Sequence, residues 1–157
     1  MNLPRKYLSP ALVATAMLAC AAIFPAMAQR EGADADNASK VGFVGDIVAA
    51  TAENTDFRRV LYTGDHIQLV VMTIQPGQEI GRETHPNLDQ FFRVEQGTAT
   101  LTLGGEQHTL EPGFVAVVPA GVDHNFANKG DEPVHLYTLY APPQHPPGTV
   151  QAQKPAE

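Results

Sequence analysis

Short apolar runs bounded by turn-forming residues dominate the sequence between residues 59 and 140. Several runs alternate apolar and polar residues with a period of two, and they are rich in Val, Ile, Thr, Phe and Tyr, which is typical of strands with one buried face. Eight strands are predicted in this way: Arg59–Tyr62, Ile67–Ile74, Gln90–Glu95, Ala99–Leu103, Gln107–Leu110, Phe114–Val118, His124–Ala127 and Val134–Tyr140. Turns such as Gly104–Gly105, a hairpin signal, separate them. The pattern predicts an all-β sandwich or barrel.

The segments before and after this region lack its pattern of strands. Asp46–Ala52 is the one segment that looks locally helical, with Asp46 as a possible N-cap. Residues 29–40 are polar without an apolar period, which predicts a flexible leader. Residues 142–157 contain five of the ten prolines that follow residue 28, so they cannot form a helix or a central strand. We expect an ordered arm there that continues as a loose tail, after a single folded domain at 41–141.

The first 28 residues have the three parts of a secretory signal. Arg5 and Lys6 precede an apolar run at about residues 11–24, and Ala26-Met27-Ala28 forms a cleavage site. We therefore expect residues 1–28 to be removed and the protein to be periplasmic or secreted, with no membrane association after removal of the signal.

A membrane anchor and a lipoprotein signal are the alternatives for this segment. A membrane anchor is disfavoured because Thr15 and Pro25 interrupt a run that is shorter than the roughly 20 residues of a bilayer span. A lipoprotein would be anchored through Cys20, but the apolar run continues past it and Met17 is a poor match to the lipoprotein pattern. Export with cleavage remains the prediction.

Length and charge narrow the function classes. A chain of 157 residues has room for one domain, and a formal net charge of -7 leaves no basic face, so nucleic acid is excluded as an expected partner. Cys20 is the only cysteine, which excludes a disulfide framework and a cysteine-based zinc site. Any metal must therefore use His, Asp, Glu or amide ligands.

Two segments share glycine frames that resemble the two motifs of the cupin superfamily. Residues 77–97, GQEIGRETHPNLDQFFRVEQG, follow the spacing of the first motif, G-(x)5-H-x-H-(x)3 to 4-E-(x)6-G. Residues 113–128, GFVAVVPAGVDHNFAN, match every fixed position of the second, G-(x)5-P-x-G-(x)2-H-(x)3-N. In the first motif His85 matches, whereas Glu83 replaces the first histidine and Gln90 replaces the glutamate. The resemblance implies a single-domain double-stranded β-helix, the cupin jelly-roll barrel.

The residues at these positions suit a metal site. Glu83 and His85 are separated by one residue, so on an extended strand both side chains leave from the same face. The cupin resemblance brings them together with Gln90 and His124 inside the barrel. Two imidazoles, one carboxylate and one amide oxygen suit one divalent ion, with manganese or iron expected. The competing interpretations are a solvated Glu83 and a Gln90 that orients a bound water.

Further residues are candidates for binding a small-molecule ligand. Three aromatic side chains either line the pocket or belong to the core, and one histidine lies in a proline-stiffened arm that could fold over the barrel mouth: Phe92, Phe126, Tyr137 and His145. Glu79, His66 and His108 are expected at the surface, and the strand position of His135 is ambiguous.

These features favour an exported metal-binding cupin that acts on a small organic molecule, with an oxidoreductase of the dioxygenase type as the first choice. Two alternatives stay open. One is a non-catalytic module that binds a small molecule or a metal. The other is a metal-free isomerase or epimerase in which Glu83 and His85 act as acid and base.

A homodimer is expected over a monomer. Small β-sandwiches leave edge strands that need cover, and Ile67–Ile74 has few charges to protect it if it lies at an edge. Proteins that resemble this one often pair by exchanging N-terminal strands.

Overall fold

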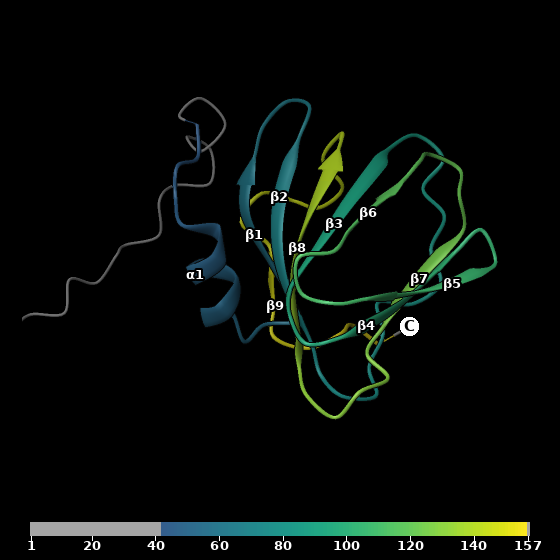
Figure 1. The fold of residues 1–157 in the computed structure, drawn as a ribbon. Helices are drawn as coiled ribbons and strands as arrows, with labels where there is room; N and C mark the ends of the chain where they lie inside the picture. Colours follow the sequence, from purple (N-terminus) through teal and green to yellow (C-terminus); the bar gives the residue numbers. More distant parts are fainter. Residues whose placement is uncertain (1–41, 157) are drawn as a thin grey trace, which may run out of the picture. The chain divides into compact units, whose positions relative to one another are not determined.

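The computed structural model describes residues 42–156, which contain nine strands and one short helix (Figure 1). The elements are α1 (Ile47–Glu53), β1 (Arg58–Thr63), β2 (Gln68–Ile74), β3 (Asp89–Gln96), β4 (Ala99–Leu103), β5 (Glu106–Leu110), β6 (Val115–Val118), β7 (His124–Ala127), β8 (Val134–Ala141) and β9 (Val150–Gln151). All eight predicted strands are present, with ends that differ by at most one residue. The expected signal segment 1–28 and leader 29–40 lie outside the described residues.

Two antiparallel sheets build the domain. The larger has the strand order β6-β3-β8-β2-β1-β9, and the smaller has the order β5-β4-β7. Residues 79–83 extend the smaller sheet beyond β7 through isolated bridges from Glu79 to Ala127 and from Glu83 to His124. The expected all-β jelly-roll architecture is confirmed, and the bridge at Glu83 brings the two glycine-framed segments together.

Alternation along the strands builds the core between the sheets. In β8 the even-numbered residues from Val134 to Tyr140 are buried and the odd-numbered ones are partly exposed. The same rule turns Gln90 and Phe92 of β3 inward, opposite Phe126 of β7. Apolar burial of this kind is the main force that holds two sheets together. The barrel interior is therefore apolar, with a few polar side chains placed in it by strand register.

Helix α1 packs against the outer face of the larger sheet. Asp46 accepts hydrogen bonds from two backbone N–H groups of the first turn at 3.0 and 3.1 Å, which confirms it as the N-cap. The Thr73 hydroxyl donates to the carbonyl of Asn54 at 2.7 Å, and Nδ1 of His135 lies 3.1 Å from the carbonyl of Thr51. His135 therefore holds the helix on the sheet. Neither α1 nor any other described segment forms a helix long and apolar enough to cross a membrane.

The C-terminal arm crosses the end of the larger sheet and is held by one buried side chain. Gln68 of β2 has no exposed surface. Its Oε1 accepts from the backbone N–H of His145 at 3.0 Å, and its Nε2 donates to the carbonyl of the same residue at 2.7 Å. Beyond this point β9 pairs with β1 at the sheet edge. The ordered arm is as expected, but the expectation of a loose tail is wrong at Val150–Gln151, where two residues form a strand that is too short to show a pattern.

The position of β2 changes the argument for a dimer. Ile67–Ile74 corresponds to β2, which lies between β8 and β1, so it is not an edge strand. Its apolar character reflects burial on both faces, since α1 and the core cover it. The ends of the larger sheet are β6 and β9.

Protonation of His145 should make the stability of the domain depend on pH. Burial, with Arg58 and His85 nearby, lowers the pKa of His145 from 6.5 to about 4. Between these two values the unfolded chain binds more protons than the folded one, so this contribution to stability is complete above 6.5 and is lost as the pH falls toward 4. Denaturation midpoints across this range should fall less steeply in His145→Gln than in wild type. The control His108→Gln changes an exposed histidine, and parallel curves for wild type and His145→Gln would contradict the prediction.

Gly97 should tolerate no side chain. Its φ is +77°, and a Cβ atom there would lie 2.5 Å from the carbonyl oxygen of Pro133. Gly77 has nearly the same φ of +76° but no atom within 4 Å of an added Cβ. Because both alanine variants share the backbone strain, the clash should make Gly97→Ala less stable than Gly77→Ala by about 1–3 kcal/mol. Urea unfolding measures this difference, and equal losses would show that the clash relaxes at no cost.

Candidate metal centre

Backbone pairing sets two of the predicted ligands side by side. The N–H of Glu83 donates to the carbonyl of His124 at 2.8 Å, and the N–H of His124 donates to the carbonyl of Glu83 at 2.9 Å. Residues directly opposite in such an antiparallel pair have adjacent side chains. His85 follows two residues later, and its carbonyl accepts from the N–H of Gly121 at 2.8 Å, in the turn that precedes His124. Backbone hydrogen bonds therefore join the two glycine-framed segments at Glu83 and again at His85.

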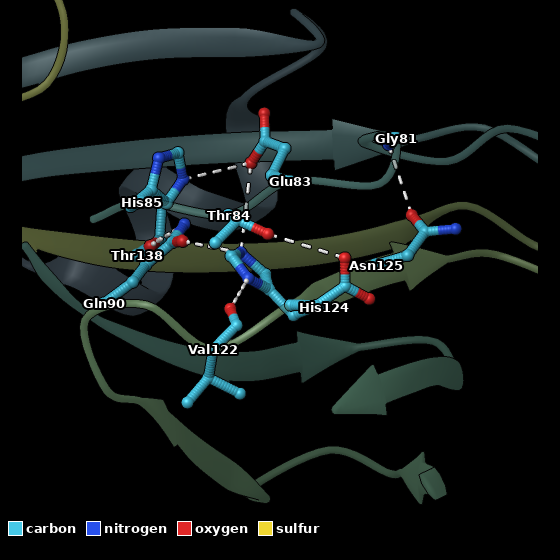
Figure 2. A network of polar contacts seen from close by, with 10 residues as sticks. Gly81, Glu83, Thr84, His85, Gln90, Val122, His124, Asn125 and Thr138 are labelled. Atoms are coloured by element: carbon cyan, nitrogen blue, oxygen red, sulfur yellow. Dashed lines mark hydrogen bonds and ion pairs between the residues drawn. The ribbon is translucent and has the colours of Figure 1, made fainter. Parts of the chain in front are cut away.

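Three ligand atoms converge inside the barrel. Oε2 of Glu83 lies 3.3 Å from Nε2 of His85 and 3.9 Å from Nε2 of His124. One ligand atom from each of the three residues lies within 4.8 Å of the other two. Figure 2 shows the three side chains pointing toward one another. Of the four predicted ligands, these three form a group of the size that one metal ion can bridge.

The donor atoms fit a cation. Oε2 of Glu83 and Nε2 of His85 are both buried, and neither has a hydrogen-bond partner. His124 is 2% exposed, and its Nδ1 lies 3.1 Å from the carbonyl oxygen of Val122. A carbonyl only accepts, so Nδ1 carries the proton and the neutral ring presents the Nε2 lone pair to the site. Unpaired buried polar atoms cost free energy, and a metal ion bound by these three residues would remove that cost.

Gln90 faces the same imidazole. Its Oε1 lies 3.1 Å from Nε2 of His124, and its Nε2 donates to the hydroxyl of Thr138 at 3.2 Å (Figure 2). In this orientation two acceptors, the amide oxygen and the imidazole lone pair, face each other. A metal ion between the two atoms, a proton on Nε2 or a flipped amide whose Nε2 donates to the ring satisfies this contact. Gln90 is 1% exposed, so water does not satisfy it from outside.

The aromatic candidates separate into two groups. Phe92 and Phe126 are fully buried, their rings stack at 5.2 Å, and Phe92 meets the ring of His124 at 6.2 Å. They form the apolar wall beneath the site. The expectation that Tyr137 lines the pocket is wrong, because it lies on the opposite face of β8, where its ring is 6.0 Å from that of Phe91.

Tyr140 takes the place that was expected for Tyr137. It is 1% exposed, and its ring centroid lies 6.3 Å from that of His85. Burial raises the pKa of its hydroxyl well above the usual range, so the group is a neutral phenol. The period of two along β8, counted from the apolar Leu136, points to Tyr140 rather than to Tyr137.

His145 lies at the edge of this group. Its ring meets that of Tyr140 edge-on, with 5.0 Å between centroids, and its Nε2 is buried without a hydrogen-bond partner. The arm thus places a neutral imidazole next to the residues around the metal centre. A cleft of about 330 Å³ opens between the loop of residues 84–88 and residues 142–144 of the arm, and His85 forms part of its wall.

The remaining polar candidates have structural or surface positions. Glu79, His66 and His108 are exposed, as expected. The amide of Asn128, the last residue of the second glycine-framed segment, donates to the carbonyls of Ile74 and Glu132 at 2.8 Å each. Asn128 therefore holds a loop and does not contribute to the metal centre.

Comparisons with known proteins agree with this fold. The cupin-domain family model matches residues 70–140. The uncharacterized protein YrkC of Bacillus subtilis is 44% identical over 118 residues, which cover 71% of this chain and 63% of YrkC, less than two thirds of its length. The uncharacterized protein L612 of Acanthamoeba polyphaga mimivirus is 38% identical over 117 residues, with 72% of this chain and 73% of L612 covered.

A solved structure gives the same result. The crystal structure of BH2720 from Bacillus halodurans superposes with a TM-score of 0.72 at 45% identity, covering 73% of this chain and 92% of BH2720. Family model, relatives and structure agree on one cupin domain, whose glycine-framed segments carry Glu83, His85 and His124. The chain belongs to the cupin family.

Proposed function

We propose that this protein is an exported cupin that uses one divalent metal ion to act on a small, oxygen-bearing organic molecule, with oxidation by dioxygen as the favoured reaction. The observation that carries the proposal is the convergence of Glu83, His85 and His124, two of whose ligand atoms are buried without a partner. Two histidines and one carboxylate with open positions are typical of non-haem iron sites, and an added amide oxygen favours manganese.

Each ligand has a defined task in this proposal. Glu83 supplies the single negative charge, and the neutral rings of His85 and His124 supply the nitrogen donors. The carbonyl of Val122 fixes the proton on Nδ1 of His124, as hydrogen bonds to the second ring nitrogen do in metal sites generally. Thr138 orients Gln90, whose oxygen faces the same nitrogen.

The surroundings control access to the site. An iron or manganese ion bound here supplies Lewis acidity and, for an oxidoreductase, a redox couple. Phe92 and the rest of the apolar core exclude water from one side. The cleft beside His85 gives a small molecule a route to the other side. A low-dielectric wall on one side strengthens every electrostatic contact made by the ligand.

A second candidate function rests on the contact between Glu83 and His85. Their side chains approach to 3.3 Å, a distance suited to a carboxylate and an imidazole that exchange a proton. A metal-free isomerase would use this pair as acid and base. A non-catalytic binding module would use the same residues to hold a ligand without converting it.

Export and dimerisation are parts of the proposal that rest on other observations. The three-part pattern of residues 1–28 supports removal of a signal before Gln29 and a periplasmic or secreted protein. A homodimer finds support at edge strand β6, where Val115 and Val117 are 54% and 59% exposed. Apolar side chains on an open edge strand favour pairing with a second strand.

Metal titration tests the centre. Calorimetry should show one Mn²⁺ bound per chain, and His124→Ala should weaken binding by at least about 100-fold, more than Gln90→Ala, because imidazole is the stronger donor and a water can replace the amide. The Mn²⁺ affinity of Glu83→Gln should lie between those of Gln90→Ala and His124→Ala or below both, since this variant removes the only anionic ligand. Binding should also weaken on acidification, because a protonated imidazole cannot coordinate.

The matched control for this titration is His108→Ala, which removes an exposed histidine outside the site. Circular dichroism checks that each variant is folded, and His85→Ala tests the site at a less buried position if His124→Ala does not fold. Stoichiometric binding that survives the loss of both His85 and His124 would rule out this centre.

Turnover separates the candidate functions. The Fe²⁺- or Mn²⁺-loaded protein, screened against catechols, diketones and small sugar acids with an oxygen electrode, should consume dioxygen with one of these classes. Glu83→Gln should reduce the rate by at least about 100-fold, whereas His108→Ala should leave it unchanged. Conversion that persists after chelation of the metal supports the acid–base alternative. Binding without conversion supports the non-catalytic module.

A further inference from the structure

A buried positive charge beside the metal centre has no acidic partner. Arg58 is the first residue of β1, it is 8% exposed, and it shares the inward face of the strand with Val60. Its Nη1 donates to Oε1 of Gln151 at 2.8 Å and its guanidinium carbon lies 5.3 Å from the centroid of the Phe57 ring, but its Nε is buried without a partner. Among the described residues no carboxylate forms an ion pair with it. Burying an unpaired charge is costly, so this one calls for an anion from outside the described chain.

Tyr140 links this charge to the metal centre. Burial raises the pKa of its hydroxyl, while a hydrogen bond and charge from Arg58, and a hydrogen bond with Gln90, act in the opposite direction. Gln90 in turn lies 3.1 Å from Nε2 of His124. Tyr140 and Gln90 therefore connect Arg58 to His124, one of the ligands of the proposed metal.

His145 adds a second unpartnered nitrogen to the same place. Gln68 bonds both the backbone N–H and the backbone carbonyl of His145, and this holds the imidazole against Tyr140. Charge from Arg58 reaches His145, and burial keeps its ring neutral near pH 7. Nε2 of His145 and Nε of Arg58 are both buried with unused hydrogen-bonding capacity.

The charges of the two groups together favour one class of ligand. A divalent ion and Arg58 bring three positive charges against the single negative charge of Glu83, so the interior keeps two positive charges. In a low-dielectric interior such an excess strongly favours an anion over a neutral molecule of the same shape. The free Nε–H of Arg58 can donate a charge-assisted hydrogen bond to a carboxylate, while its Nη1 stays bonded to Gln151.

We propose that Arg58, Tyr140 and His145 form a carboxylate-binding subsite next to the metal centre, so that the natural ligand is a small organic acid. The proposal rests on the proposed function for its metal, and it narrows the substrate class from oxygen-bearing molecules to acids. One end of the ligand lies at the metal centre, and its carboxylate lies at Arg58. The neutral His145 donates or accepts one further hydrogen bond.

A paired-ligand titration tests the subsite. Malonate and its neutral analogue malonamide are titrated into the Mn²⁺-loaded protein and into Arg58→Gln, with Mn²⁺ affinity measured separately in each. Malonate affinity should fall at least about 10-fold in Arg58→Gln, while malonamide and Mn²⁺ affinities change by less than about 2-fold, because only the anion uses the guanidinium. Tyr140→Phe should reduce malonate affinity by a smaller factor, since it removes the hydroxyl that links Arg58 to the centre.

The control is Arg59→Gln, on the same strand, where an exposed arginine pairs with Asp56. It should leave malonate binding unchanged. Malonate affinity that is the same in wild type and Arg58→Gln overturns the subsite. If Arg58→Gln does not unfold cooperatively, the decision passes to Tyr140→Phe and His145→Gln, and unchanged malonate binding in both overturns it equally.

The outcomes also separate the subsite from the metal centre. Failure of Mn²⁺ to bind would contradict the proposed function and with it the subsite, whose excess of positive charge depends on the metal. Mn²⁺ binding together with malonate affinity that is indifferent to Arg58 would overturn the subsite and leave the metal centre standing.

Discussion

The pairing of Glu83 with His124 is the interaction on which the site depends. Two backbone hydrogen bonds join residues that are 41 positions apart, and they bring a carboxylate and an imidazole side by side. Strand geometry then directs His85 to the same face, and the turn at Gly121 is bonded to His85. The ligand set is therefore held by the backbone, whose geometry changes little when side chains vary. Preorganisation of this kind lets a site keep unpaired lone pairs ready for a cation.

Buried polar side chains also hold the C-terminal arm in place. Gln68 bonds both the N–H and the carbonyl of His145, and Arg58 bonds Gln151 of β9, 93 residues further along the chain. Both are polar side chains on the inner face of an otherwise apolar sheet, which is costly unless each atom finds a partner. Gln68 is fully paired, whereas Arg58 and His145 each keep one buried nitrogen unpaired. In the proposed subsite a bound carboxylate would supply the missing partners of these two nitrogens.

Much of this arrangement follows from local patterns. Alternation and turn residues predicted eight strands, and the resemblance of the two glycine-framed segments to the cupin motifs grouped Glu83, His85, Gln90 and His124. The expectation that Tyr137 lines the pocket was wrong because it placed Tyr137 on the inner face of β8, whereas the period of two counted from the apolar Leu136 turns Tyr140 inward. Burial of Arg58 had no local signal, since it depends on Tyr140 and Gln151, which come from strands far along the chain. Strand β9 was missed because two residues cannot show a period.

Anomalous diffraction from crystals soaked in Mn²⁺ tests the central claim most directly. Data collected at the manganese absorption edge should give one strong peak per chain within coordination distance, about 2.0–2.3 Å, of Oε2 of Glu83 and of Nε2 of His85 and His124. Gln90 should remain with its oxygen toward that peak. An empty position with His85 hydrogen-bonded to Glu83, or a peak elsewhere on the chain, would contradict the assignment of these residues as a metal centre.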